Sequence, residues 1–305
     1  MNHSQTALTN STYGLINADC VAELSQNDHI SDWSSATSLS LATIASLTRG
    51  YSLNHLMDQF TAWYARGDYT ANRSAQMVDR TTIRSIEHYM INHDPFSSGS
   101  HATDDIDNGA LLRIMPVVLY LNSQYGSDFI SNGAAMLSLH QVTGLTHNQP
   151  TALITNSIYA FFVNQLLIDQ QPVDAFETAI DAAYDYYSKH QIFQEALSAF
   201  EQLNTPDFKN TAMSQLVASN DAVETLTAYI WIVLNASSYP EALEMAQDIT
   251  GDATTLMPLV GTTAGLLFES NLDGMDHIQK YGRSMVKRII TAGNRSYHFE
   301  QLSFN

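Results

Sequence analysis

A carboxylate and two hydroxyl groups lie close together near residue 250 and could bind a cation or a sugar. The segment reads Gly251-Asp252-Ala253-Thr254-Thr255, and the small and apolar residues that follow, 256–268, predict a buried helix. A helix N-terminus presents free N–H groups and favours anions, so this loop is a candidate catalytic or binding site. Asp252 before a helix is also a common capping residue, and both interpretations stay open at this point.

A second group of polar residues surrounds Asn108-Gly109, which opens a predicted helix. The preceding segment, residues 92–107, contains Pro, Gly and Ser and has no hydrophobic periodicity. Loops of this length are usually functional or mobile. Three acids close the segment and either supply an acid to a site or form a solvated loop: Asp104, Asp105 and Asp107.

Helices are predicted for the segments that flank these groups. Apolar residues recur at steps of three and four from Val223 to Val233, and a further helix is predicted over 75–91. No alternating pattern of useful length indicates a strand. We therefore predict an all-α fold, in which residues 13–305 form a single-domain, multi-helix orthogonal bundle and residues 1–12 form a flexible leader.

The composition narrows the classes of partner. The chain of 305 residues carries 31 acidic and 13 basic side chains, a formal net charge of −18. Such a charge argues against nucleic acid or an anionic membrane as the main partner. One cysteine, Cys20, excludes an intramolecular disulfide and fits a reducing compartment. With no signal-peptide pattern and no apolar run of membrane length, we expect a cytoplasmic protein.

Five segments carry a more specific signal, in this order: Tyr13–Asp19, Trp33–Thr37, Asn108–Pro116, Thr146-His147 and Gly251–Thr255. They resemble, respectively, the opening Gly-Asp turn, the Thr-Asp-Asp-Thr element, the Asn-Gly-x-Leu-Met-Arg-x-x-Pro element, the Thr-His pair and the Gly-Asp-x-Asp-Thr loop of the ADP-ribosylglycohydrolase family. Each motif alone is weak, but five in the right order on an all-α pattern make a specific match.

The resemblance implies a fold, a ligand and a reaction. Family members have an all-α fold with a cleft for ADP-ribose and two divalent cations, usually Mg²⁺ or Mn²⁺. They hydrolyse the bond between the anomeric carbon of the ribose and its acceptor. Four positions of this chain are implied to bind the ligand: Asp19, Asn108, Gly109 and His147. His147 at a helix end is equally compatible with a structural hydrogen-bonding role.

The implied metal positions depart from the family. The Thr-Asp-Asp part of the early element falls on Ser34, Ser35 and Ala36, so both carboxylates are replaced. In the late element Asp252 and Thr255 are retained, whereas Thr254 replaces the second Asp. A further acid expected early in the chain falls near Gln26, with Glu23 out of register. Hard divalent cations prefer charged oxygen ligands, so we predict no tightly bound cofactor, and weak Mg²⁺ or Mn²⁺ binding if the site is partly retained.

Three hypotheses follow from the sequence. The first is a catalytically impaired member of this family that retains binding of ADP-ribose or a related nucleotide. The second is an active hydrolase of an ADP-ribosyl N- or O-glycosidic bond, using a remodelled site in which Asp252 is the catalytic carboxylate. The third is a non-enzymatic interaction protein whose acidic surface binds a basic partner.

Overall fold

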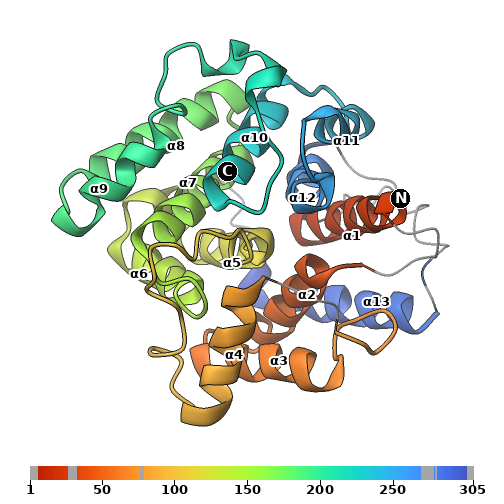
Figure 1. Ribbon diagram of the computed structural model, residues 1–305. Helices are drawn as coiled ribbons and strands as arrows, with labels where there is room; N and C mark the ends of the chain where they lie inside the picture. Colours follow the sequence, from red (N-terminus) through yellow and green to blue (C-terminus); the bar gives the residue numbers. More distant parts are fainter. Residues whose placement is uncertain (1–5, 27–32, 76–78, 269–277, 279, 301–305) are drawn as a thin grey trace.

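The computed structural model describes residues 6–26, 33–75, 79–268, 278 and 280–300. The described residues form α-helices joined by short 3-10 turns, with isolated β-bridges, so the prediction of an all-α fold is confirmed (Figure 1). The α-helices are α1 (Ala7–Gln26), α2 (Ser35–Leu47), α3 (Leu53–Arg66), α4 (Arg80–Asn92), α5 (Met115–Tyr125), α6 (Gly133–Thr143), α7 (Pro150–Leu167), α8 (Pro172–Tyr187), α9 (Gln194–Leu197), α10 (Ala222–Asn235), α11 (Tyr239–Asp248), α12 (Met257–Phe268) and α13 (Lys280–Asn294).

The centre of the molecule is built around α7 and α5. Every residue of α7 from Ala152 to Leu166 is buried, and several of its polar side chains find partners inside, as Asn156 does with the Ala152 carbonyl and Asn164 with that of Gly126. The helices α1, α2 and α10 lie around this centre in Figure 1 and contribute further core residues. The 3-10 turns η1 (Leu111–Arg113) and η7 (Ala253–Thr255) lie at the helix ends where the functional residues gather.

The helices α1 and α12 approach each other closely because glycines face across their interface (Figure 1). A Cβ atom at Gly14 would lie 2.2 Å from the carbonyl oxygen of Gly261, and one at Gly261 would lie 2.2 Å from the Cβ of Ala18. Any larger residue would force the two helices apart. This contact fixes the position of Asp19 on α1 relative to the loop that precedes α12.

The predicted leader over residues 1–12 is wrong for residues 7–12, because α1 begins at Ala7. The Ser11 hydroxyl donates to the carbonyl of Ala7 at 2.7 Å, and the Thr12 hydroxyl donates to that of Leu8 at 2.6 Å. These small side chains donate hydrogen bonds to carbonyl groups of their own helix and can therefore be buried. A polar composition does not prevent this segment from packing against the rest of the protein. Residues 1–5 lie outside the described residues. The single-domain boundary at residue 13 stays a prediction.

No helix among the described residues is both long enough and apolar enough to cross a membrane. The apolar residues of the core helices pack against one another.

Candidate functional site

The first element of the site is the N-terminus of α2, which the Asp19 carboxylate holds in place. One Asp19 oxygen accepts hydrogen bonds from the backbone N–H groups of Ser34 (3.0 Å) and Thr37 (3.3 Å) and from both of their hydroxyls (3.0 and 2.6 Å). Asp19 is only 1% exposed, and burial raises the pKa of its carboxyl group although these four donors oppose the shift. The structure therefore gives Asp19 a role in positioning α2, whereas the resemblance implied a ligand contact.

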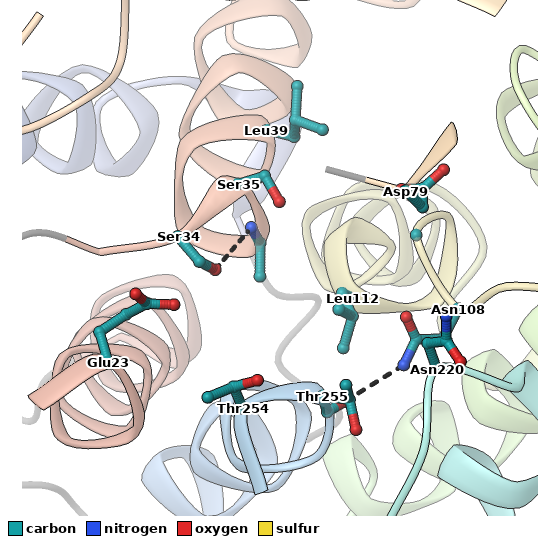
Figure 2. Close-up of a pocket in the computed structure, with 12 residues that line it drawn as sticks. Glu23, Ser34, Ser35, Leu39, Asp79, Asn108, Leu112, Asn220, Thr254 and Thr255 are labelled. Atoms are coloured by element: carbon teal, nitrogen blue, oxygen red, sulfur yellow. Dashed lines mark hydrogen bonds between the residues drawn. The ribbon is translucent and has the colours of Figure 1, made fainter. Parts of the chain in front are cut away.

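The second element is the turn formed by Asn108 and Gly109. The Asn108 side-chain amide donates to the Thr225 hydroxyl at 2.9 Å and to the backbone carbonyl of Thr255 at 3.3 Å (Figure 2). Its backbone N–H donates to the Asn220 carbonyl at 2.8 Å. Asn108 thus ties three distant segments together, and at 5% exposure it is mainly a structural residue at the edge of the site.

The third element is the loop before α12. Gly251 has a φ of +125°, and a Cβ there would lie 2.0 Å from the Ala218 carbonyl oxygen, so glycine is required. The exposed Asp252 carboxylate accepts hydrogen bonds from the backbone N–H of Thr254 at 3.0 Å and from its hydroxyl at 2.7 Å. Asp252 therefore caps the η7 turn, which was one of its two interpretations.

These elements enclose one cavity of about 190 Å³ (Figure 2). Six of the positions singled out in the sequence line it: Ser34, Ser35, Asn108, Gly109, Thr254 and Thr255. Asp19, His147 and Asp252 are not part of this lining. We call the side formed by Ser34, Ser35, Thr254 and Thr255 the hydroxyl wall.

The cavity also has two acidic lining residues, Glu23 and Asp79: the sequence placed Glu23 out of register with the family's early acid and did not indicate Asp79. In Figure 2 Glu23 projects from α1 beside Ser34, whereas Asp79 lies on the opposite side, above Asn108. Asp79 was placed inside a predicted helix over 75–91. In the structure it is the N-cap of α4, and its Oδ1 accepts the Thr82 backbone N–H at 2.5 Å. The sequence Asp79-Arg80-Thr81-Thr82 carries this capping signal.

Asp79, Asp107 and His147 form a cluster that we call the carboxylate wall; of the three, Asp79 lines the cavity and the other two lie behind it. His147 is fully buried, and its Nε2 lies 2.5 Å from Asp107 Oδ1 and 3.8 Å from Asp79 Oδ1. The second Asp107 oxygen accepts a hydrogen bond from the Thr81 hydroxyl. Asp107 is thus not part of a solvated loop, although Asp104 is exposed. Asp105 bonds instead to Ser100 and lies 3.5 Å from Arg84.

A buried arginine supports the carboxylate wall from behind. Arg113 is 3% exposed and donates to the Gly109 carbonyl at 2.6 Å and to the Thr146 hydroxyl oxygen. Thr146 Oγ1 in turn lies 2.7 Å from His147 Nδ1. Burial lowers the pKa of Arg113 to about 10, and the charges of Asp79 and Asp107 oppose that shift. His147 therefore has a structural position within a charged network, behind the cavity surface.

The two carboxyl groups of this wall differ in their affinity for a proton. Burial raises the pKa of Asp79, and the nearby Asp107 adds to that shift while His147 opposes it. Burial alone would also raise the pKa of Asp107, but its hydrogen bond and charge interaction with His147 lower it below the ordinary value. Two neighbouring carboxyl groups with opposite shifts are typical of functional sites, although structural ion networks also produce them.

The fold and this arrangement of motifs define an ADP-ribosylglycohydrolase-type protein. The sequence model of the family described as ADP-ribosylglycohydrolase matches residues 4–279, and the chain belongs to this family. The chain is similar to two proteins named ADP-ribosylarginine hydrolase Tri1. It is 20% identical to that of Serratia proteamaculans (strain 568) over 239 residues, which are 78% of this chain and 60% of the relative. It is 22% identical to that of Pseudomonas putida (strain GB-1) over 244 residues, 74% of this chain and 58% of the relative.

The chain therefore spans about 60% of the length of these curated relatives. A solved structure of an ADP-ribosylglycohydrolase-related protein complex matches the fold with a TM-score of 0.68. That match covers 98% of this chain and 99% of the other at 18% sequence identity, which supports the architecture and not a particular activity.

Proposed function

We propose that this protein binds an ADP-ribosyl group in the cavity between its two walls and has lost hydrolysis that depends on a two-metal site. The observation that carries the proposal is the cavity lining itself. Positions from three elements that resemble family motifs, around Ser34, Asn108 and Thr254, lie far apart in the sequence and line one cavity. A protein that had kept the fold only as a scaffold would have no need to keep this cavity.

The hydroxyl wall does not fit two divalent cations. Ser34 Oγ accepts the Ala36 backbone N–H at 3.1 Å and donates to Asp19, so it serves as a helix cap. Thr254 and Asp252 are hydrogen-bonded to each other. Neutral hydroxyls supply no negative charge to offset two cations, and Mg²⁺ in particular is usually bound through carboxylates. We therefore propose that the family's metal pair does not form on this wall.

The cavity volume favours partial enclosure of the ligand. Pockets that bury most of a drug-sized ligand occupy ~300–1,000 Å³. At about 190 Å³ this cavity holds a ribosyl group with its neighbouring phosphate, and the rest of an ADP-ribose would lie on the open surface. Because the relatives are named for ADP-ribosylarginine, an ADP-ribosylated side chain is a candidate ligand alongside free ADP-ribose.

A second candidate function is hydrolysis of an ADP-ribosyl bond by a remodelled site. The observation that favours it is the Asp79 carboxyl on the cavity wall, whose pKa is raised by burial and which could therefore hold a proton. Glycoside hydrolysis commonly needs a carboxylic acid of this kind. Asp252, the residue we first assigned to this role, is exposed and caps a turn, so Asp79 is now the better candidate for the acid.

The test is a calorimetric titration of ADP-ribose into the purified protein, once with Mg²⁺ and once with EDTA. We expect equal binding in both. Ser35→Phe adds an aromatic ring to the cavity lining and should abolish the heat of ADP-ribose binding. Ser131→Phe in the η2 turn (Gly126–Ser131) should leave that heat unchanged. Binding that requires Mg²⁺ would contradict the loss of the metal pair. Release of ADP-ribose from ADP-ribosylarginine at an enzyme-like rate would favour the second candidate.

A further inference from the structure

Three potential metal ligands converge at the carboxylate wall, from segments far apart in the chain. Asp79 precedes α4, Asp107 precedes the Asn108-Gly109 turn, and His147 follows α6. One ligand atom from each residue lies within 4.8 Å of the others. Two carboxylates and an imidazole form a donor set that suits a transition metal, because imidazole nitrogen is a preferred ligand of Zn²⁺ and its neighbours.

The residues behind the ligands resemble the outer shell of a metal site. Metal-binding histidines usually donate their second ring N–H to a fixed acceptor, which orients the imidazole. Here His147 Nδ1 lies 2.7 Å from Thr146 Oγ1, and Arg113 donates to the same oxygen. If Nδ1 carries the proton toward Thr146, Nε2 points its lone pair at the two carboxylates. The Thr81 hydroxyl and the Thr82 backbone N–H likewise fix the orientation of Asp107 and Asp79.

An unsatisfied hydroxyl beside Asp79 provides an independent sign of a missing ligand. Thr82 Oγ1 is fully buried and has no hydrogen-bond partner. A Cβ added at Gly109 would lie 2.1 Å from Asp79 Oδ2 and 3.0 Å from Thr82 Oγ1, so both oxygens pack against this glycine and lie near each other. Buried hydroxyls without a partner are rare, and one in such a place points to a water or ion.

We propose that Asp79, Asp107 and His147 form a site for one divalent transition-metal ion, with Zn²⁺ as its representative. Ligand distances of about 2.0–2.2 Å would require the three ligand atoms to stand somewhat more than 3 Å apart. The present distances from His147 Nε2, 2.5 and 3.8 Å, bracket that value, so side-chain shifts of less than about 1 Å complete the site. The ion replaces the proton that otherwise joins Nε2 to Asp107.

The charge balance of the wall is compatible with a divalent ion. Two carboxylates face one guanidinium group, that of Arg113, so a metal with neutral His147 leaves the cluster with one positive charge. Asp79 lines the cavity, and a ligand hydroxyl or a water could occupy the remaining coordination positions from that side. The site lies on different residues from the positions that the family resemblance assigns to Mg²⁺ or Mn²⁺, and it does not depend on ADP-ribosyl binding.

The test uses Co²⁺ as a spectroscopic probe and Zn²⁺ as its competitor. The full chain is stripped with a chelator, dialysed and titrated with Co²⁺ while the visible absorption is recorded. We expect one equivalent of Co²⁺ to produce ligand-field bands and one equivalent of Zn²⁺ to remove them, with no effect of Mg²⁺. Asp107→Asn should weaken binding by more than about 100-fold, and Thr146→Val, behind the ligands, by about 10–100-fold.

Matched variants separate this site from other acidic groups. Asp105→Asn alters a neighbouring acid of the same loop, and Asp252→Asn alters the retained carboxylate of the late element. Both should bind Co²⁺ as the unmodified protein does. Absence of saturable Co²⁺ binding, unchanged affinity in Asp107→Asn, or loss in Asp252→Asn alone would each overturn the proposal. If Asp107→Asn shows no cooperative unfolding and is therefore not folded, the Co²⁺ affinities of Asp79→Asn and Thr146→Val test the proposal. Unchanged affinity in both variants would overturn it.

Discussion

The two walls of the cavity differ in the exposure of their polar side chains and in the hydrogen bonds that these side chains make. On the hydroxyl wall the side chains are partly exposed, and several of their hydrogen bonds are local, as between Ser34 and Ala36 and between Thr254 and Asp252. On the carboxylate wall His147 is fully buried, the two carboxylates are mostly buried, and the bonds of Asp107 to His147 and to Thr81 span long sequence distances. We therefore expect substitutions on the hydroxyl wall to change the free energy of unfolding little. On the carboxylate wall a substitution affects several hydrogen-bonded partners at once.

This difference explains which positions could lose their charge. A carboxylate at residue 35 or 254 would be partly exposed, so water could solvate it without a protein cation beside it. Asp79 and Asp107 have the Arg113 guanidinium nearby, and its charge offsets part of the cost of burying them. We infer that negative charge persists where the protein itself supplies the compensating cation.

Removal of that cation should have the largest effect on stability. Arg113→Met removes a buried guanidinium whose charge interacts with both Asp79 and Asp107, which should cost about 3–5 kcal/mol in the free energy of unfolding. Arg66→Met is the control, because the ion pair of Arg66 with Asp68 is exposed and should contribute less than about 1 kcal/mol. Urea unfolding at neutral pH measures both. Equal effects of the two variants would mean that the carboxylate wall is not an interdependent network.

The two carboxyl groups should respond to pH with opposite sign. The pKa of Asp107 is lowered on folding, so its contribution to stability is present above the ordinary Asp value of about 3.9 and is lost as the pH falls below it. The pKa of Asp79 is raised, so its contribution is present below about 3.9 and is lost as the pH rises through its folded value. Asp107→Asn should cost about 1–3 kcal/mol at pH 7 and less near pH 3.

Asp79→Asn is the counterpart of that variant and should cost less at pH 7 than near pH 3. Asparagine remains a good N-cap, so α4 keeps its first turn. Urea midpoints at the two pH values, measured with EDTA present, give the comparison. The same sign of pH dependence in both variants would contradict the opposite pKa shifts.

The helical architecture could be predicted from local sequence signals, whereas the positions of the hydroxyl wall were indicated by the family resemblance alone. Apolar periodicity indicated the helices, and Ser34, Asn108 and Thr254 lie in motifs whose order pointed to one cleft. The carboxylate wall could not be predicted, because its members come from three segments whose proximity depends on tertiary packing. Asp79 was also hidden inside a helix predicted to begin at residue 75, although the residues after it carry a capping signal.

Two polar regions show what a sequence leaves open. Residues 7–12 were expected to belong to a leader but form the start of α1, and the ligand contact expected of Asp19 stays a prediction. In both cases polar groups are buried because nearby backbone groups satisfy them, as Ser11 does with Ala7 and as Asp19 does with Ser34 and Thr37. A sequence shows that a residue is polar, but only the fold shows whether its partner is water, a ligand or the chain.

A cap on the hydroxyl wall should matter less than any member of the carboxylate wall. Ser34→Ala removes the N-cap of α2 and one donor to the buried Asp19, so we expect a loss of about 1 kcal/mol. Ser52→Ala removes the N-cap of α3, which has no buried carboxylate behind it, and should cost somewhat less. Thermal unfolding of the two variants in one buffer tests this order. A larger loss in Ser52→Ala would show that Asp19 does not depend on Ser34.

Restoring charge to the hydroxyl wall should have the smallest effect on stability and change what the wall binds. Ser35 and Thr254 are partly exposed, and a carboxylate at the start of α2 interacts favourably with the helix N-terminus. Ser35→Asp combined with Thr254→Asp should shift the free energy of unfolding by only ~0.5 kcal/mol. It should also strengthen Mn²⁺ binding relative to the unmodified protein, which is measured by the water-proton relaxation of added Mn²⁺. Equal Mn²⁺ binding before and after the change would mean that the missing carboxylates are not what distinguishes the two walls.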